Sequence, residues 1–416
     1  MRLLKILLCA VICGALLAGC AGLEDASSKP DFTRVPENWS NSEGQAVQTA
    51  DYRAMWFSYL EWPLLDTSNE QTFTESVTQV LDNCKEMGLN TIIVQVRPFA
   101  DAIYPSELFP WSHLVTGVQG QAPAYDPLEI FVREAHAREL SIEAWINPYR
   151  IRLNDTMPPE LSGADSLSVT HPEWVKEAAG GLYLDPGNEE VMDYICAGVE
   201  EVIRNYQVDG IQFDDYFYPT TEESFDLAQF EAEGNGLTLA DWRRQNVNQM
   251  VQKVYQTVHF LGEELGREIY FGISPQGNND NNYNGQYSDV GLWLSTAGYV
   301  DYVMPQVYWG YDYTLQSGSD RYAFSNIAAE WAAMPRDESV SLYFGLGAYR
   351  IGDGDGSSTP SQEWQSGHNL ADMVNTLAQN GYGYSLYRYA NLFANTAYPE
   401  LAQAECAALQ TANGAT

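Results

Sequence analysis

The sequence contains little positive charge and little histidine. Its 21 Lys and Arg residues are outnumbered by 56 Asp and Glu residues, which gives a formal net charge of −35 at pH 7. A surface of that sign repels nucleic acid and other anionic polymers that proteins hold by charge. The 5 His residues fall mostly in segments expected to be helices or loops, away from strand ends. We therefore expect no nucleic-acid partner, no metal ion and no other cofactor.

Cysteine is equally scarce. Only Cys84, Cys196 and Cys406 follow the first 20 residues. An odd and sparse set of cysteines is not a disulfide framework, and the spacing matches no metal site. Because Cys84 and Cys196 fall in amphipathic helical patterns, we expect buried thiols at both positions.

Long apolar runs are missing except at the N-terminus. There, Arg2 and Lys5 precede an apolar run from Leu7 to Leu17, and Leu-Ala-Gly-Cys closes the run at positions 17–20. A basic start, a short apolar run and small residues before a cleavage point are typical of a secretory signal. The run is too short to predict a membrane-spanning helix.

The Leu-Ala-Gly-Cys ending is similar to a bacterial lipobox, which implies cleavage before Cys20 and lipidation of that residue. Residues 1–19 would then be the signal peptide. Residues 20–50 are rich in polar side chains and lack apolar periodicity, as is typical of a flexible tether. We expect a protein of the bacterial cell envelope, anchored by lipid to the extracytoplasmic side of a membrane.

Residues 51–410 alternate short apolar runs with amphipathic helical windows. Strands are expected at 52–59, 91–97, 142–148, 210–215, 269–275, 302–309, 341–348 and 383–389. Helices are expected at 73–87, 127–139, 189–206, 239–265, 288–297, 322–334, 369–380 and 401–409. Eight strand–helix units predict an α/β fold, namely a single-domain (β/α)8 TIM barrel. The intervening residues 149–186 are interpreted as a long loop that covers the site.

Polar and aromatic side chains gather at the downstream ends of these strands, where parallel barrels build their active sites. The amides and guanidinium groups belong to Gln95, Arg97, Asn147, Gln276, Gln306 and Arg388, and the rings to Tyr149, Tyr216, Tyr308 and Trp309. Aromatic faces stack on sugar rings, while amides and guanidinium groups bond to hydroxyls. The pattern indicates a pocket for a neutral, hydroxyl-rich ligand.

The segment 209–219, DGIQFDDYFYP, places two carboxylates at the end of the fourth strand. Because successive strand residues point to opposite faces, Gln212 and Asp214 should face the barrel mouth while Asp215 points away. We expect Asp214 to act as nucleophile or to stabilise positive charge, and Asp215 to bind substrate or to orient a neighbour. The alternative is a solvated acidic strand end.

Six motifs along the chain resemble those of one family. They are RAMW at 53–56, NTIIVQVRPFADAIYPS at 90–106, LDPG at 184–187, DGIQFDDYFYP at 209–219, FGISP at 271–275 and MPQVYW at 304–309. Together they look like glycosyl-hydrolase-like family ten, which includes lipoproteins that cleave denuded peptidoglycan glycan strands. The resemblance implies a TIM barrel and glycoside hydrolysis. Many members carry Glu directly after the sixth-strand Trp, where this chain has Gly310.

Hydrolysis by two carboxylates requires a partner for Asp214 from another strand. We expect Asp101 first, Asp312 second and Glu61 third as the acid/base, because each follows a strand. A surface or capping role is the alternative for all three. Glu143 lies early in its strand, where a structural ion pair is the better explanation.

The sequence therefore favours a lipid-anchored glycoside hydrolase that acts on a polysaccharide, with denuded peptidoglycan glycan strands as the substrate that the resemblance suggests. A second hypothesis is a non-catalytic glycan-binding lipoprotein, which Gly310 favours and the intact Asp214, Asp215 and Asp101 oppose. A third, metal-assisted deacetylation or hydrolysis, needs ligands that the strand ends do not offer. The sugar and the oligomeric state stay open.

Overall fold

A computed structural model describes residues 51–154, 156–159 and 166–415. The predicted signal peptide, the lipidated Cys20 and the tether lie outside these residues. The described residues fall within one compact unit. None of the helices found among them is long and apolar enough to cross a membrane.

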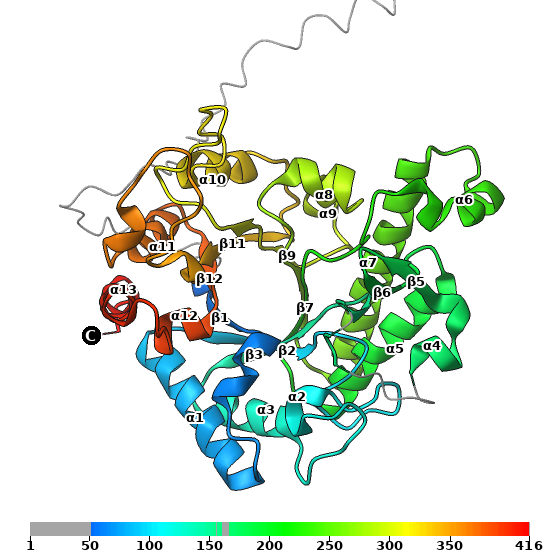
Figure 1. The fold of residues 1–416 in the computed structure, drawn as a ribbon, viewed down its shortest axis with the longest axis horizontal. Coiled ribbons are helices and arrows are strands. Elements are labelled where there is room, and N and C mark those ends of the chain that lie inside the picture. The colour runs from blue at the N-terminus through cyan, green and yellow to red at the C-terminus, as the bar shows by residue number, and fades with distance from the viewer. Residues whose placement is uncertain (1–50, 155, 160–165, 416) are drawn as a thin grey trace, which may run out of the picture. The chain divides into compact units, whose positions relative to one another are not determined.

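Eight parallel strands close into a barrel, which confirms the predicted fold (Figure 1). They are β1 (Arg53–Phe57), β2 (Thr91–Arg97), β3 (Ser141–Ile146), β7 (Gly210–Phe213), β8 (Tyr270–Ile273), the two-part strand β9 (Tyr302–Val303) and β10 (Gln306–Val307), β11 (Ser341–Gly347) and β12 (Gly383–Tyr387). The barrel closes because β12 pairs with β1, and because β9 pairs with both β8 and β11.

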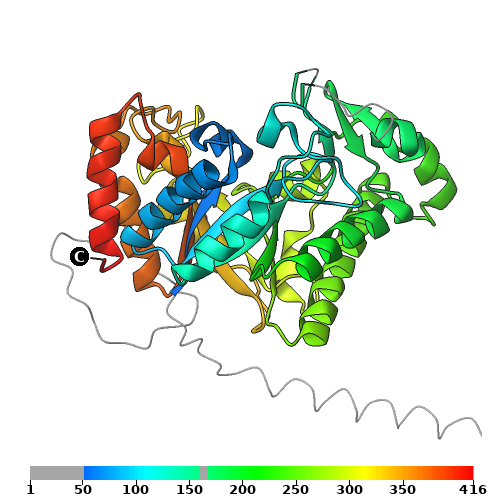
Figure 2. The same cartoon turned by 90° about the horizontal axis from the view of Figure 1, so that it is seen from below.

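Helices surround the barrel and cover its outer face (Figures 1 and 2). The main ones are α1 (Glu70–Glu86), α3 (Pro127–Ala137), α5 (Glu189–Asn205), α7 (Leu239–Leu265), α9 (Val290–Ser295), α10 (Phe324–Ala332), α11 (Asn369–Gln379) and α13 (Pro399–Ala412). Short polar side chains cap the N-termini of several of these helices by accepting a backbone N–H of the first turn. The capping residues are Asn69, Asp126, Asn188 and Thr238. Gly266, in the left-handed conformation, ends α7.

The core has two parts that follow the alternation of strand side chains. A small cluster fills the barrel interior with Ala54, Trp56, Ile93, Trp145, Tyr302 and Met304. A much larger cluster lies between the strands and the helices and contains the expected buried thiols, Cys84 and Cys196. The middle of the barrel is therefore packed with side chains, and cavities lie at both of its ends.

The segment after β3 is not the long loop that the sequence suggested. It forms a three-stranded antiparallel sheet in the order β4-β6-β5, built from β4 (Arg150–Arg152), β5 (Val175–Ala178) and β6 (Gly181–Leu184). Ala179 and Gly180, both with positive φ, make the turn between β5 and β6. These strands are too short to show a clear period-two pattern in the sequence.

Candidate active site

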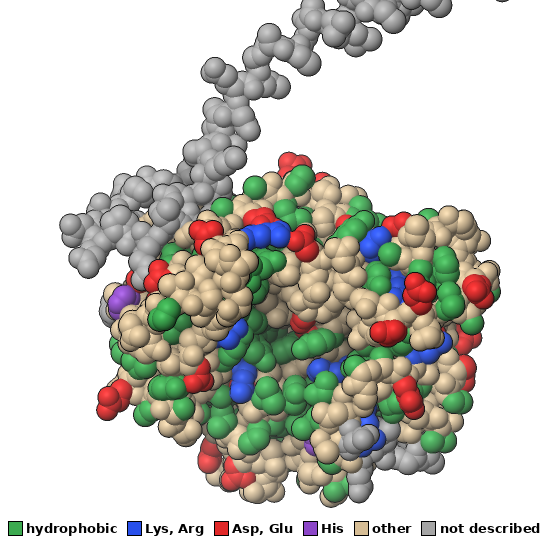
Figure 3. All heavy atoms as spheres, turned by 45° about the horizontal axis from the view of Figure 1, so that its top comes forward, with side chains coloured by type: hydrophobic (Ala, Val, Ile, Leu, Met, Phe, Trp, Pro, Cys, Tyr) green, Lys and Arg blue, Asp and Glu red, His purple; other side chains and the backbone are tan. Residues whose placement is uncertain are grey.

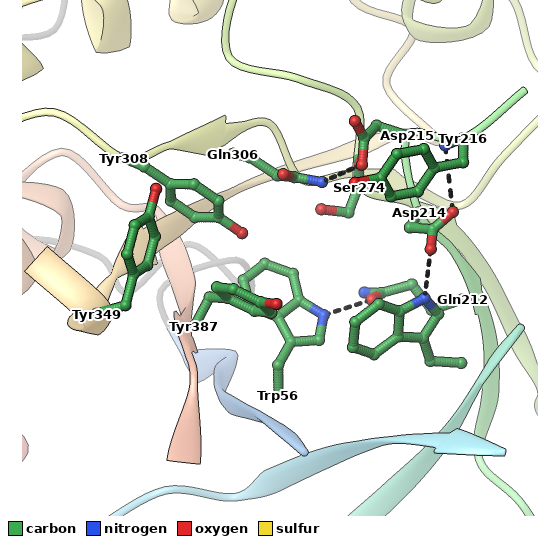
Figure 4. Close-up of a pocket in the computed structure, with 11 residues that line it drawn as sticks. Trp56, Gln212, Asp214, Asp215, Tyr216, Ser274, Gln306, Tyr308, Tyr349 and Tyr387 are labelled. Carbon is green, nitrogen blue, oxygen red and sulfur yellow. Dashed lines mark hydrogen bonds between the residues drawn. The ribbon is translucent and has the colours of Figure 1, made fainter. Parts of the chain in front are cut away.

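A pocket of about 290 Å³ opens at the C-terminal ends of the barrel strands. The space-filling view shows the hollow and the hydrophobic side chains gathered in it (Figure 3). The pocket is lined by Trp56, Trp145, Gln212, Asp214, Asp215, Tyr216, Ser274, Gln306, Tyr308, Tyr349 and Tyr387. Two carboxylates thus lie among mainly aromatic walls (Figure 4).

Asp214 is held by N–H donors from two neighbouring segments. Trp145 Nε1 and Asn147 Nδ2 each donate to its Oδ2 at 3.1 Å, and the backbone N–H of Tyr216 donates to Oδ1 at 3.2 Å. Asn147 also accepts the backbone N–H of Arg150 at 3.0 Å, which fixes the orientation of its amide. The carboxylate of Asp214 is therefore pre-positioned rather than free to rotate.

Asp215 is held by two side-chain amides. Gln276 Nε2 donates to its Oδ2 at 3.0 Å, and Gln306 Nε2 donates to its Oδ1 at 3.0 Å. Gln306 also donates to the carbonyl of Ser274 at 2.9 Å, and a β-bridge joins Gln276 to Gln306. The two amides come from the ends of β8 and β10, so adjacent strands build this clamp.

The expectation that Asp215 points away from the site was wrong. The strand β7 ends at Phe213, so the alternation of a regular strand does not extend to either aspartate. Both carboxylates turn into the pocket from the irregular backbone beyond the strand. Gln212, the last inward-facing residue of β7, lines the pocket as expected.

Burial and mutual repulsion govern the protonation of the two aspartates, which are 3% and 7% exposed. Burial raises the pKa of Asp214 to about 7, the charge of Asp215 acts in the same direction, and Arg150 opposes both. Burial also raises the pKa of Asp215, against the donation of Gln306 and Gln276. Because two like charges in one pocket do not both ionise readily, the pair retains a proton near neutral pH.

A chain of hydrogen bonds connects the pocket floor to the opposite end of the barrel. Trp56 Nε1 donates to Gln212 Oε1 at 2.6 Å, and Gln212 Nε2 donates to the hydroxyl of Tyr302 at 2.9 Å. Tyr302 donates in turn to Glu143, which also accepts from Tyr52 at 2.7 Å. Glu143 therefore bonds to tyrosine hydroxyls and not to a cation, and burial raises its pKa to about 7.

A second cavity of about 410 Å³ adjoins the first. Asp215, Gln306, Tyr308 and Tyr349 line both, which places them at the boundary. The remaining walls of the second cavity are Gln276, Gly277, Asn278, Asn281, Trp309 and Arg350. Aromatic and amide walls of this kind suit sugar rings and their hydroxyls, and the two adjoining cavities provide space for more than one sugar unit.

Besides Gln212 and Asp215, five of the predicted binding residues line these two cavities, namely Tyr216, Gln276, Gln306, Tyr308 and Trp309. Asn147 does not line either cavity, but its side-chain amide donates a hydrogen bond to Asp214. The remaining four, Gln95, Arg97, Tyr149 and Arg388, line neither cavity.

Gln95, Arg388 and Tyr149 lie outside the two cavities because each makes contacts elsewhere. Gln95 accepts the backbone N–H of Tyr59. Arg388 forms an ion pair with Glu61. The ring of Tyr149 is fully buried in the core outside the barrel.

A bulge explains the position of Arg97. The register of β2 against β3 shifts between Gln95 and Arg97, so Arg97 pairs with Ile146. This extra residue turns Arg97 to the outer face, where its guanidinium lies 4.0 Å from the ring centre of Phe109.

The three carboxylates expected as partners of Asp214 also bond elsewhere. Asp101 is fully buried and accepts from Gln119 Nε2 at 3.0 Å. Asp312 accepts from Ser361 Oγ at 2.8 Å, and Glu61 accepts from Ser58 and Arg388. None of them lines the pocket, so the geometry favours Asp215 as the partner of Asp214.

Five further residues that line the pocket were not predicted as site residues, although two of them, Trp56 and Ser274, fall in the family motifs at 53–56 and 271–275: Trp56, Trp145, Ser274, Tyr349 and Tyr387. The two tryptophans lie on the inward faces of β1 and β3, and strict alternation along those strands would have placed them inside the barrel. Tyr387 ends β12, and Tyr349 follows β11.

A (β/α)8 barrel whose C-terminal mouth holds buried carboxylates among aromatic rings has the architecture of a glycan-acting hydrolase. The chain matches the family glycosyl hydrolase-like 10 over residues 51–365. It belongs to that family.

Two curated relatives are named as glycosyl hydrolases. The chain is 36% identical over 329 residues to glycosyl hydrolase YngK of Bacillus subtilis (strain 168), a match that covers 74% of this chain and 62% of YngK. It is 32% identical over 363 residues to glycosyl hydrolase DigH of Escherichia coli (strain K12), with 79% and 80% covered. The match therefore spans about three fifths of YngK and most of DigH.

Among solved structures, the glycoside hydrolase domain of PgaB (BpsB) from Bordetella bronchiseptica superimposes with a TM-score of 0.53 and 12% sequence identity. The superposition covers 84% of this chain and 96% of that domain, and it shows a shared fold. The family and the two relatives together support a hydrolase that acts on glycans.

Proposed function

We propose that this protein is a lipid-anchored glycoside hydrolase that cleaves a polysaccharide in the bacterial cell envelope. The observation that carries the catalytic part is the pair of buried aspartates at the mouth of the barrel, held by N–H donors and surrounded by aromatic rings. Burial raises the pKa of both carboxylates, and desolvated carboxylates of raised pKa are suited to exchange protons with a glycosidic oxygen. The names of the curated relatives agree with this chemistry.

Denuded peptidoglycan glycan strands are the substrate that we propose first. The basis is the set of six motifs that resemble the family, together with the second cavity, which provides room for a further sugar unit. Anchoring through Cys20 rests on the lipobox-like ending of the N-terminal apolar run. It would hold the enzyme on the side of the membrane where cell-wall glycan lies.

The test is digestion of denuded glycan strands and a panel of other polysaccharides with the purified full-length protein. We expect new reducing ends and shorter fragments from at least one glycan, and none with the Asp214→Asn variant. Cleavage by that variant at the wild-type rate would remove Asp214 from the mechanism. Glycan binding without cleavage by the wild-type protein would instead favour the glycan-binding hypothesis.

A further inference from the structure

The two carboxylates of the pocket are consecutive in the chain. Among the residues that the structure describes, Asp214 and Asp215 are the carboxylates that line it, and both follow β7 (Figure 4). Hydrolysis with a carboxylate nucleophile needs an acid and a nucleophile on opposite sides of the sugar ring. Consecutive residues, whose Cα atoms lie about 3.8 Å apart, approach a bound sugar from one side. The described part of the pocket therefore lacks a carboxylate on the opposite wall.

That opposite wall consists of aromatic residues. Tyr308 and Tyr387 stack with their ring centres 5.6 Å apart, and Tyr349 packs edge-on against Tyr308 at 5.5 Å. Figure 4 shows the hydroxyls of Tyr308 and Tyr387 directed into the pocket, with the indole of Trp56 beside them. Phenolic hydroxyls can donate to a carbonyl oxygen, and the indole face suits a methyl group.

We infer that the nucleophile is the substrate's own 2-acetamido group, so that the enzyme cleaves next to a 2-acetamido sugar by neighbouring-group participation. This inference rests on the proposed glycosidase function and specifies the class of sugar in the first cavity. The tyrosine hydroxyls would hold the acetamido carbonyl below the anomeric carbon. Intramolecular attack from a held position has the high effective concentration that enzymatic catalysis requires.

The position of each aspartate suggests its role. Asp215 borders both cavities, so it lies where the bond between the two sugar units would cross. That is the position of the general acid. Asp214 borders only the first cavity, where the acetamido group would lie. Three N–H groups already fix its orientation, and we place the acetamido N–H as a fourth donor to its carboxylate. In the complex the acetamido N–H adds one more donor to Asp214, which favours the anionic form of Asp214 and moves the shared proton to Asp215.

Water is the only reactant that the reaction needs besides the glycan. The acetamido oxygen forms a bond to the anomeric carbon while the glycosidic C–O bond breaks, and Asp215 gives its proton to the leaving oxygen. Asp214 stabilises the positive charge on the resulting oxazolinium ring through its N–H. Water next attacks the anomeric carbon, Asp215 accepts a proton from it, and the ring opens to restore the acetamide. The product retains its anomeric configuration.

The test uses full-length protein and one glycan in three chemical forms. Denuded glycan strands are N-deacetylated, and portions are re-acylated with acetyl or with trifluoroacetyl groups, which have similar shape but very different nucleophilicity. We expect the re-acetylated glycan to be cleaved as the native one is, and the trifluoroacetylated glycan about 100-fold more slowly or worse. A thiazoline analogue of the cyclic intermediate should inhibit competitively.

Two variants separate the roles of the aspartates. Asp215→Asn should lose cleavage of the natural glycan but regain it on an aryl glycoside of the 2-acetamido sugar, whose leaving group needs no proton. Asp214→Asn should lose both activities and the affinity for the thiazoline. Asp193→Asn, which removes an exposed carboxylate from α5, serves as the matched control and should behave as the wild type.

The outcomes distinguish this inference from the proposed function. Equal cleavage of the acetylated and trifluoroacetylated glycans, or a covalent sugar adduct on an aspartate, would overturn the inference while the glycosidase function stands. Failure of the wild-type protein to cleave any glycan would overturn the function itself.

Discussion

The carboxylate of Glu363 occupies the space into which a side chain at position 310 would extend. A Cβ added to Gly310 would lie 2.1 Å from Glu363 Oε1. Glu363 is in turn bound by the backbone N–H groups of Tyr311 and Asp312, at 2.7 and 3.2 Å. The position after the sixth-strand tryptophan is thus a glycine against which Glu363, the first residue of the 3-10 helix Glu363–Gln365, packs.

We predict that Gly310→Ala lowers the free energy of unfolding by about 1–3 kcal/mol, because Glu363 must leave its two backbone donors. Denaturant unfolding of the variant measures the loss. In the Glu363→Ala background the same substitution should cost much less, since the clash is gone. An equal cost in both backgrounds would show that the packing described here is not the cause.

Asp214 should make stability depend on pH. Its pKa in the folded protein is raised to about 7, so folding favours the protonated form. The stability that this provides is complete below the unfolded-state pKa and is lost as pH rises through about 7. Asp214→Asn, which cannot ionise, should therefore gain stability relative to wild type as the pH rises from about 5 to about 8, by about 2 kcal/mol. Denaturant unfolding at several pH values measures this change, and a constant difference across that range would contradict it.

The activity should fall as pH rises through about 7. The aspartate pair needs one proton to act as an acid, and burial together with mutual repulsion sets the upper pKa of the pair near that value. Measurement of kcat/KM against pH on the free enzyme reports this pKa. Full activity about two pH units above that value would show that the proton donor is another group.

Asp101→Asn should change catalysis little, although Asp101 headed the sequence-based candidates for the acid. The residue is fully buried and bonds to Gln119, outside the pocket. We expect kcat close to the wild-type value. We also expect a lower unfolding midpoint, because the amide brings two N–H donors that need acceptors into a fully buried position. Loss of kcat without loss of stability would return Asp101 to the mechanism.

Cys20→Ala should release the protein from membranes. Lipid chains on Cys20 are the anchor that the N-terminal sequence predicts, and more than one chain is needed for stable attachment. Fractionation after a high-salt wash measures the result. Retention of the variant in the membrane fraction would show that the lipobox interpretation is wrong.

The barrel could be predicted from the sequence because the apolar residues of its long strands and helices repeat at the spacing typical of each element. The strand 91–97 and the helix 239–265 have the predicted bounds. The apolar run of that strand is buried on both faces, and the helix has a Thr cap and a Gly stop at its ends.

Site residues were harder to predict because they lie where regular structure ends. The position of Arg97 at the downstream end of its strand predicted that it lies in the mouth, but one extra residue in β2 turns it outward. Alternation turned Asp215 away, although the strand had already ended at Phe213. Such irregularities depend on contacts between distant segments, as in the clamp of Gln276 and Gln306 on Asp215, and local sequence does not encode them.

The direction of β1 has a consequence for how the enzyme meets its substrate. All barrel strands are parallel, so Arg53 begins β1 at the face opposite the mouth that holds Asp214. Any attachment through the N-terminus therefore joins the barrel from behind. The substrate can therefore approach Asp214 and Asp215 without passing the point at which the chain enters β1.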